Sequence, residues 1–422
     1  MVKGNAAVSL FIAGLACEYP SYSMTQDQFE EVIKTLYPEY SSSPGLQKLI
    51  SFNRKTRIAS RRIVFDYSKW TIDDAAPPPI DELSRIFRTV GVDLTVRACG
   101  KAMQEAKLLA TDVTHTVAVT CTDQGNPGYD LLVCQKLQLL PTVQRVLLHG
   151  VGCAGGLSAL RAAANIAAAA SQRGQAARII VFSCEICSLF FRAELQAAFQ
   201  DKEKLHIAPA LFSDAAAAVI VCNELAVGEK RREIFQLQEW GSMVMPGTLS
   251  HMSYEIERNG MIANMSKDVP KTAVSAITPM FNQLCGFSTT PFKLRPATRC
   301  ESSGFDWALH PGGAAILEGA QKVLQLTDDH IRASLDVYKS YGNSSSTTVL
   351  IVLDKLRRMG DGRDRVVAAS FGPGLMIEMF IMRRGRDVGE IHSLTLGLHD
   401  KIQRYWLAYQ YRLRKIRKLI KA

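Results

Sequence analysis

The chain lacks several features that would assign it to common protein classes. None of its apolar stretches can cross a bilayer as a helix, because the alanine-rich run 162–170 is too short and too weakly hydrophobic. The first residues alternate into a glycine and an acidic residue, which is typical of a core strand and not of a signal peptide. We therefore expect a soluble, cytoplasmic protein.

The ten cysteines lack the pattern of a disulfide framework. Most of them lie inside apolar runs, as Cys121 and Cys222 do, and this is typical of reduced, buried thiols. Cys184 and Cys187 form one C-x-x-C pair, but no second pair completes a zinc site. Metal-ligand spacing is absent elsewhere, so we expect neither a metal nor a redox cofactor.

Acidic residues are missing from residues 401–422, which carry eight Lys and Arg side chains. Because the net charge of the whole chain is +10, the rest of the chain carries only +2. The basic pI of about 9.1 therefore reflects this segment and not the body of the protein. No fold signature of a nucleic-acid-binding protein accompanies the charge, so nucleic acid is not an expected partner.

The apolar residues of the same segment recur every three or four positions, which predicts a basic amphipathic helix in a C-terminal extension over 391–422. Three roles remain open for it. It can dock on the body or on a partner subunit, lie at a membrane surface with its cations toward anionic headgroups, or extend into solvent. The second role would make a cytoplasmic enzyme peripheral on a membrane.

Apolar strand-like runs alternate with helix-like segments through most of the chain, which indicates an α/β fold with a largely covered sheet. The segments 155–173 and 313–324 have helical character. The strand candidates are 116–121, 145–151, 178–185, 215–223, 305–311 and the long run 365–384. The two halves of the chain look alike in this respect, which allows a duplicated architecture.

Cys153 lies in the turn GCAGG between a strand candidate and the helix 155–173. A sulfur near a helix N-terminus is stabilised as a thiolate by the peptide dipoles and the free N–H groups. The glycines on both sides permit a tight turn and the close approach of a ligand. The alternative is a cysteine that only packs, which is the commoner case for such a turn.

Two polar residues of the second half can act as partners of Cys153. His310 ends a strand candidate in WALHPGG, and Asn343 lies in the polar turn YGNSS before a buried segment. A histidine can exchange protons, and both side chains can donate hydrogen bonds. The alternatives are a strand-end histidine bonded to backbone and an asparagine that caps a helix.

Four motifs in this order resemble the type III polyketide synthases, the chalcone-synthase-like enzymes of the thiolase fold. They are GCAGG (152–156), WALHPGG (307–313), YGNSS (341–345) and SFGPGL (370–375). The resemblance covers roughly residues 5–385 and is greatest to fungal members. It implies two similar α/β halves, 1–230 and 231–390, in a layered α-β-α-β-α arrangement, and a homodimer.

The resemblance also implies the chemistry. Cys153 as a thiolate, paired with His310 as an imidazolium, would take an acyl group from a CoA thioester. His310 and Asn343 would then stabilise the enolate formed when malonyl-CoA loses its carboxylate. Acyl-CoA and malonyl-CoA are thus the expected substrates, with no further cofactor.

Several chamber residues follow from the same resemblance. Phe212 matches the family's gatekeeper between the CoA tunnel and the chamber, Phe371 lies in its scaffolding loop, and Ser345 matches a small lining residue. Lys48 and Lys55 match its CoA-binding lysines. A solvated basic helix face is the alternative for the other cations of this cluster.

Three positions depart from the plant enzymes. Cys187 and Phe190 replace chamber threonines, and Ala263 replaces a phenylalanine. Fewer hydroxyl groups and a small residue at 263 favour a medium- or long-chain fatty acyl starter and an alkyl-pyrone or resorcinol-type product. Phe190 instead favours a shorter starter, because a large side chain there shortens one branch of the cavity.

Two other classes stay open on the sequence alone. One is a condensing enzyme like ketoacyl-acyl-carrier-protein synthase III, which shares the Cys-His-Asn trio. The other is a catalytically silent acyl- or membrane-binding protein on a thiolase scaffold.

Overall fold

The computed structural model describes residues 8–385 except 227–232, 259, 287–299 and 361. The chain divides into residues 1–384 and 385–422, and the first of these parts contains all the elements below. The amphipathic helix expected within 391–422 lies outside the described residues. The expected division of the body between residues 230 and 231 falls within the undescribed residues 227–232 and stays a prediction.

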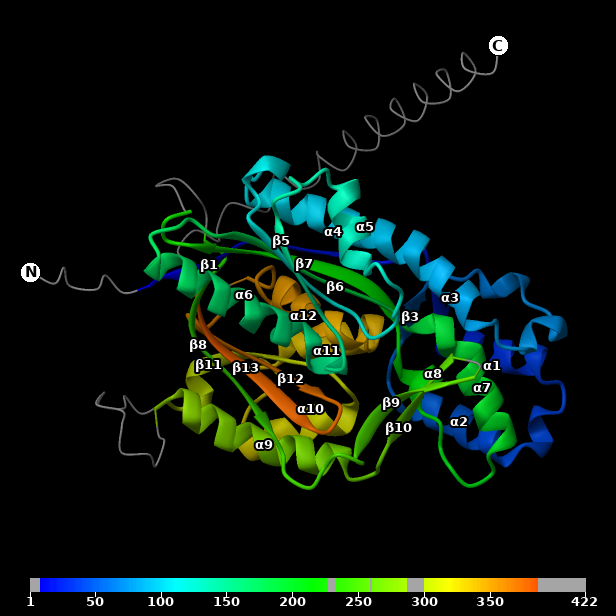
Figure 1. Ribbon diagram of the computed structural model, residues 1–422. Coiled ribbons are helices and arrows are strands. Elements are labelled where there is room, and N and C mark those ends of the chain that lie inside the picture. Colours follow the sequence, from blue (N-terminus) through cyan, green and yellow to red (C-terminus); the bar gives the residue numbers. More distant parts are fainter. Residues whose placement is uncertain (1–7, 227–232, 259, 287–299, 361, 386–422) are drawn as a thin grey trace, which may run out of the picture. The chain divides into compact units, whose positions relative to one another are not determined.

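A mixed sheet of nine strands runs through the described part of the chain, in the order β11-β12-β13-β8-β1-β7-β6-β4-β5 (Figure 1). Its strands are β1 (Leu10–Glu18), β4 (His115–Val119), β5 (Gln144–Leu148), β6 (Arg178–Ile186), β7 (Asp214–Asn223), β8 (Phe235–Val244), β11 (Phe305–Leu309), β12 (Arg365–Gly372) and β13 (Met376–Arg384). Two small two-stranded sheets are made of β2 (Tyr22–Thr25) with β3 (Ser60–Ile63) and β9 (Met252–Glu257) with β10 (Gly260–Met265).

The strand directions repeat in the two halves of the large sheet. In the first half, β1 pairs antiparallel with β7, β7 antiparallel with β6, and β6 parallel with β4. In the second half, β8 pairs antiparallel with β13, β13 antiparallel with β12, and β12 parallel with β11. This repetition agrees with the two similar halves that the resemblance implies.

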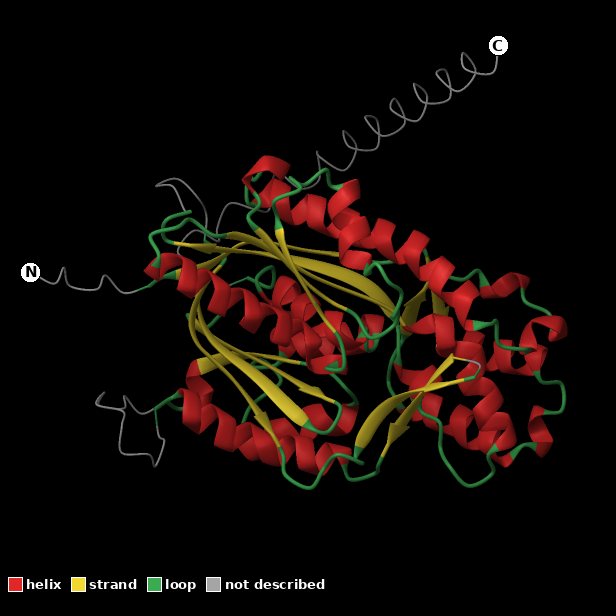
Figure 2. Ribbon diagram, viewed as in Figure 1, coloured by secondary structure: helices red, strands yellow, loops and turns green. Residues whose placement is uncertain are grey.

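Helices cover the sheet in layers (Figure 2). The helices α4 (Val92–Glu105) and α5 (Tyr129–Lys136) pack on the outer face of the first half, and α9 (Val269–Leu284) and α10 (Ala314–Leu324) pack on the outer face of the second. Between the halves lie α6 (Gly155–Gln172) and α12 (Thr348–Leu356), whose apolar side chains share one core. The other helices are α1 (Gln26–Leu36), α2 (Pro44–Lys55), α3 (Ile80–Ile86), α7 (Phe191–Gln200), α8 (Ala208–Leu211) and α11 (Arg332–Tyr341).

The sequence predictions of the elements are largely confirmed. The runs 116–121, 145–151, 178–185 and 215–223 are strands β4 to β7, and the helical segments are α6 and α10. Every residue of β7 is buried, as expected for a central strand with helices on both faces. The run 365–384 is a hairpin of β12 and β13. No helix of the described part is long and apolar enough to cross a membrane.

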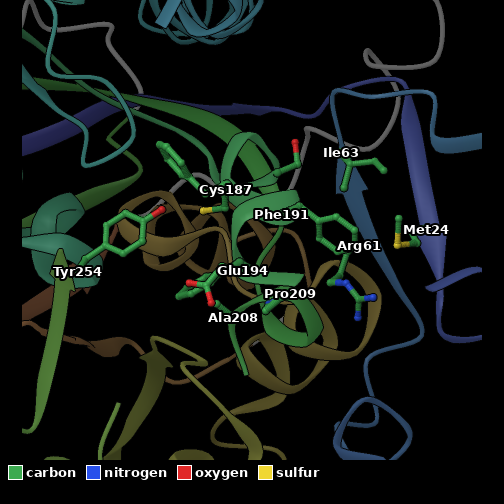
Figure 3. A pocket seen from close by; sticks show the side chains of 12 residues that line it. Met24, Arg61, Ile63, Cys187, Phe191, Glu194, Ala208, Pro209 and Tyr254 are labelled. Atoms are coloured by element: carbon green, nitrogen blue, oxygen red, sulfur yellow. The ribbon is translucent and has the colours of Figure 1, made fainter. Parts of the chain in front are cut away.

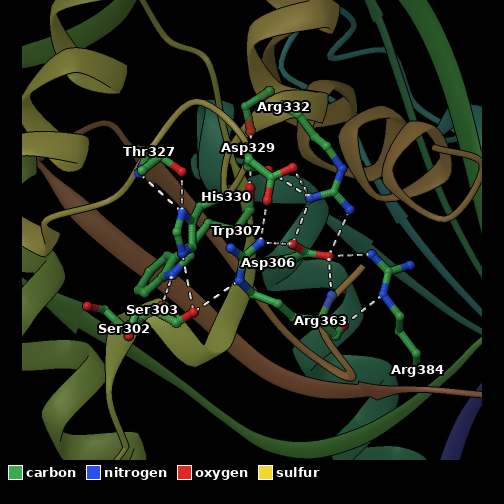
Figure 4. Close-up of polar contacts among 11 residues, drawn as sticks. Ser302, Ser303, Asp306, Trp307, Thr327, Asp329, His330, Arg332, Arg363 and Arg384 are labelled. Carbon is green, nitrogen blue, oxygen red and sulfur yellow. Dashed lines mark hydrogen bonds and ion pairs between the residues drawn. The ribbon is translucent and has the colours of Figure 1, made fainter. Parts of the chain in front are cut away.

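A buried ion cluster fixes the start of β11 (Figure 4). Asp306 is fully buried and accepts hydrogen bonds from Arg332 (2.7 Å), Arg384 (2.7 Å) and Arg363 (3.0 Å). Burial raises the pKa of its carboxyl group, but the hydrogen bonds from the arginines outweigh burial and hold the pKa below its ordinary value. The cluster ties β11, the start of α11 and the end of β13 together.

Candidate active site

Cys153 lies in a single turn of 3-10 helix, Gly152–Ala154, directly before α6. Gly152 has a φ of +46°, and a Cβ there would lie 2.5 Å from Pro373. A Cβ at Gly156 would lie 2.3 Å from the carbonyl oxygen of Ser346. The glycines therefore let this turn approach the two chain segments that complete the site, as the sequence predicted.

Ser345 and Asn343 face the thiol. The Oγ of Ser345 lies 3.4 Å from the Sγ of Cys153. The Oδ1 of Asn343 accepts hydrogen bonds from the N–H of Ser345 (2.8 Å) and from the Oγ1 of Thr348 (3.3 Å). These bonds fix the amide, so that its NH2 group is the part left to donate toward the sulfur.

His310 follows the last residue of β11. Its backbone N–H donates to the backbone carbonyl oxygen of Ala369 in β12 (2.8 Å). Strand β12 in turn packs against the turn that carries Cys153. The imidazole is 2% exposed, and neither ring nitrogen has a hydrogen-bond partner among the described residues. A buried donor or acceptor without a partner is costly, so this ring is available to a ligand.

Burial shifts the pKa of both groups toward their neutral forms. It raises the pKa of Cys153 to about 11, against hydrogen bonds from Ser345 and Asn343 that lower it. It lowers the pKa of His310 to about 3. Both shifts favour a neutral thiol and a neutral imidazole over the thiolate and imidazolium that the resemblance implies. The reason is that removal from water disfavours both charged forms.

The sequence interpretation missed Glu185, which is fully buried at the end of β6. It accepts hydrogen bonds from the Sγ of Cys121 (3.2 Å), from Thr122 (3.1 Å) and from Ser346. Burial raises the pKa of its carboxyl group, and these bonds oppose the shift. An acidic residue inside the apolar run VFSCEI was the available signal.

A small pocket adjoins these groups (Figure 3). Cys187, Phe190 and Phe212, which the resemblance assigns to the chamber, lie on its wall. The ring of Phe190 meets that of Tyr254 edge-on, with the centroids 5.8 Å apart. Phe212 also forms a β-bridge with Asn343, so the pocket lies next to the site around Cys153.

The remaining predicted residues lie farther out or deeper. Phe371 is buried in β12 and packs in the core under α9 and α10. Ala263 is buried in β10, outside the lining of this pocket. Lys48 and Lys55 lie exposed on α2, and the Nζ of Lys48 donates to the carbonyl oxygen of Lys202 (2.8 Å).

A half-buried thiol that faces an amide and a hydroxyl group is suited to hold an acyl group, because these donors can bind the carbonyl oxygen of a thioester. The fold and this site therefore define the class of cysteine-dependent acyltransferases. Residues 47–224 match the N-terminal domain of the chalcone and stilbene synthases, and residues 236–385 match their C-terminal domain. The chain belongs to this family and is a type III polyketide synthase.

Fungal relatives match nearly the whole chain. The type III polyketide synthase pspB of Penicillium soppii is 46% identical over 89% of this chain and 96% of its own length. The acylalkylpyrone synthase csyB of Aspergillus oryzae is 34% identical over 91% of this chain and 97% of its own. The crystal structure of the fungal type III polyketide synthase ORAS superposes with a TM-score of 0.83, at 37% identity over 89% of this chain and 99% of that one.

Proposed function

We propose that the protein is an iterative synthase that loads an aliphatic, medium- or long-chain acyl group on Cys153. It extends this group with malonyl-CoA and closes the product as an alkyl-pyrone or a resorcinol-type ring. The observation that carries the proposal is the Cys153 thiol, which faces Ser345 and Asn343. His310, whose ring nitrogens have no partner among the described residues, completes the proposed trio.

In the loading step, the sulfur of Cys153 attacks the carbonyl carbon of acyl-CoA while His310 takes the thiol proton. His310 then returns that proton to the departing CoA sulfur, so that the residue ends neutral. Transfer within a buried neutral pair avoids a standing charge pair in a site of low dielectric. The hydrogen bonds around Asn343 hold its amide toward the developing oxyanion.

In the extension step, malonyl-CoA loses its carboxylate as CO2, and the electron pair passes to the thioester oxygen as an enolate. The N–H groups of neutral His310 and of Asn343 stabilise this oxygen. The enolate carbon then attacks the acyl thioester and expels Cys153 as a thiolate, which takes a proton from solvent. The lengthened chain, now a thioester of CoA, returns to Cys153 by the loading step and releases CoA-SH. Repetition lengthens the chain until cyclisation ends it.

CoA recognition belongs to the same proposal, with Lys48 and Lys55 as the cations for its phosphates. A crystal structure of csyB, described as complexed with CoA-SH, superposes on this chain with a TM-score of 0.82 at 34% identity, which supports CoA thioesters as the substrates. We further propose a homodimer and the membrane-surface role for residues 391–422. If the full chain and a chain ending near residue 395 bind anionic liposomes equally, the membrane role is wrong.

The experiment that tests the function combines labelled malonyl-CoA with acyl-CoA starters of graded length. Pyrone or resorcinol products are expected from the wild type and none from Cys153→Ala. Cys134→Ala removes a buried thiol on α5, away from the site, and serves as the matched control. Unchanged product in Cys153→Ala would overturn the mechanism.

A further inference from the structure

Arg61 is a buried cation on the wall of the pocket that Cys187 and Phe190 also line, and it lies close to Phe191 (Figure 3). It lies in β3, is 1% exposed, and its guanidinium stacks over the ring of Phe29 at 4.9 Å. Its Nη1 donates to the Oδ1 of Asn53 (3.1 Å) and to the carbonyl oxygen of Ala210 (2.9 Å). Its Nη2 has no hydrogen-bond partner among the described residues.

This arginine also lacks a carboxylate partner within the described part of the chain. Burial lowers its pKa to about 10, so it stays charged at neutral pH. A buried charge is normally paired, and a buried donor without an acceptor costs a large part of a hydrogen bond. The other buried arginine cluster follows that rule, since Arg332, Arg363 and Arg384 all bond Asp306.

Glu194 supplies a second unsatisfied polar atom to the same pocket. It is 3% exposed on α7, and its Oε1 accepts from the N–H of Ala263 (2.7 Å). Its Oε2 has no hydrogen-bond partner among the described residues, and the nearest cationic candidate is the Nδ1 of His206 at 3.5 Å. The pocket thus offers a donor without a partner on Arg61, and on Glu194 an acceptor without a hydrogen bond that lies 3.5 Å from the Nδ1 of His206.

The rest of the wall is apolar. Met24, Ile63, Phe191, Ala208 and Pro209 surround the two charged groups. Phe212 on this wall forms a β-bridge with Asn343, so we expect an acyl chain held on Cys153 to reach the wall from that side. A plain alkyl end would leave both polar atoms unpaired, whereas an oxygen on the chain would meet them.

Resting on the proposed function, we infer that this pocket binds an oxygen-bearing part of the substrate, a hydroxyl or keto group carried on an acyl chain away from its thioester. A hydroxyl oxygen can accept from Arg61 and donate to Glu194, and a keto oxygen can accept from Arg61. A carboxylate is disfavoured because it would also face the charge of Glu194. The preferred starter is therefore an oxygenated acyl-CoA, not the simple alkyl one.

The test compares starters of equal length that end in methyl, hydroxyl, keto or carboxyl groups, with the wild-type protein and malonyl-CoA. The hydroxyl and keto starters are expected to have a kcat/KM about tenfold or more above that of the alkyl starter, because they satisfy buried charged groups. Equal or higher kcat/KM for the alkyl starter overturns the inference and leaves the proposed function standing.

Variants test the two polar atoms separately. In Glu194→Gln, the amide oxygen still accepts from the N–H of Ala263, but an NH2 group replaces the acceptor Oε2. A keto starter is therefore expected to have a higher kcat/KM than the hydroxyl starter in this variant. Arg61→Lys is expected to lower the preference for both, and thermal melting shows whether it folds. Glu31→Gln, on the exposed face of α1, is the control. An unchanged starter ranking in folded variants contradicts the inference.

A measurement without turnover separates the two proposals. The Cys153→Ala variant binds acyl-CoA without reacting, and calorimetry compares the oxygenated and alkyl starters. Tighter binding of the oxygenated starters supports the pocket even if no starter yields product, in which case only the proposed function fails. Equal binding overturns the pocket assignment.

Discussion

The buried polar side chains at the start of strand β11 are hydrogen-bonded, whereas the buried imidazole just past its end is not. At its start, Asp306 accepts hydrogen bonds from three arginines, and His330 nearby is bonded at both ring nitrogens, to Thr327 (2.8 Å) and to Ser303 (3.2 Å). Just past its end, His310 is equally buried and its ring nitrogens have no partner among the described residues. One strand therefore carries a satisfied cluster and an unsatisfied site.

The difference separates what holds the fold from what awaits a ligand. A paired buried charge destabilises the fold strongly when one partner is removed, since the others stay buried without compensation. An unpaired buried group already bears that cost, so its removal should affect chemistry more than stability. The same contrast distinguishes Arg61 from the arginines around Asp306.

The largest expected effect comes from breaking the ion cluster around Asp306 at the start of β11. Asp306→Asn should lower the free energy of unfolding by about 3–5 kcal/mol, because three arginines lose their countercharge. Urea unfolding measures the change, and Asp364→Asn, which removes an exposed pair with Arg383, should cost about 0–1 kcal/mol. Equal losses in the two variants would contradict the comparison.

The next prediction concerns His310, whose ring lies just past the end of β11. His310→Gln should lower kcat by about 10²–10³-fold through the loss of an oxyanion donor and proton carrier, with little change in Tm. His330→Gln should do the reverse, since its ring nitrogens hold backbone and side-chain groups. Steady-state kinetics and thermal melts on both variants check the pair. A large stability loss in His310→Gln would show that this ring is structural.

The pH dependence of thiol alkylation sharpens the account of Cys153. With a pKa of about 11, the thiolate fraction grows tenfold for each unit of pH below that value. Modification of Cys153 by iodoacetamide in the free protein should thus accelerate about a hundredfold between about pH 7 and about pH 9. Mass spectrometry follows the adduct, and a rate that is flat over this range would mean that the thiolate exists already.

The smallest expected effect comes from disturbing the packing around the ion cluster of Asp306. A Cβ at Gly362 would lie 2.3 Å from the Oδ2 of Asp306 and 2.5 Å from the Nη2 of Arg332. Gly362→Ala should therefore cost about 1–3 kcal/mol of unfolding free energy. Gly304→Ala meets no atom within 4 Å and should cost less in the same urea titration.

The sequence predicted the elements and the catalytic trio better than the surroundings of the trio. Cys153, His310 and Asn343 each sit in a local motif with its own turn residues, and local patterns are readable from sequence. Glu185 and Arg61 depend on which distant segments pack beside them, which a strand pattern does not specify. The charge state of Cys153 stays a prediction, because the burial that shifts its pKa comes from tertiary packing.

The most direct test of the central claim is to incubate the free protein with acyl-CoA, without malonyl-CoA, and to map the acyl adduct by peptide mass spectrometry. The account predicts a thioester on Cys153 among the ten cysteines and its loss in Cys153→Ala. An adduct on the neighbouring Cys121 or Cys187 instead, or an adduct that persists in Cys153→Ala, would contradict it.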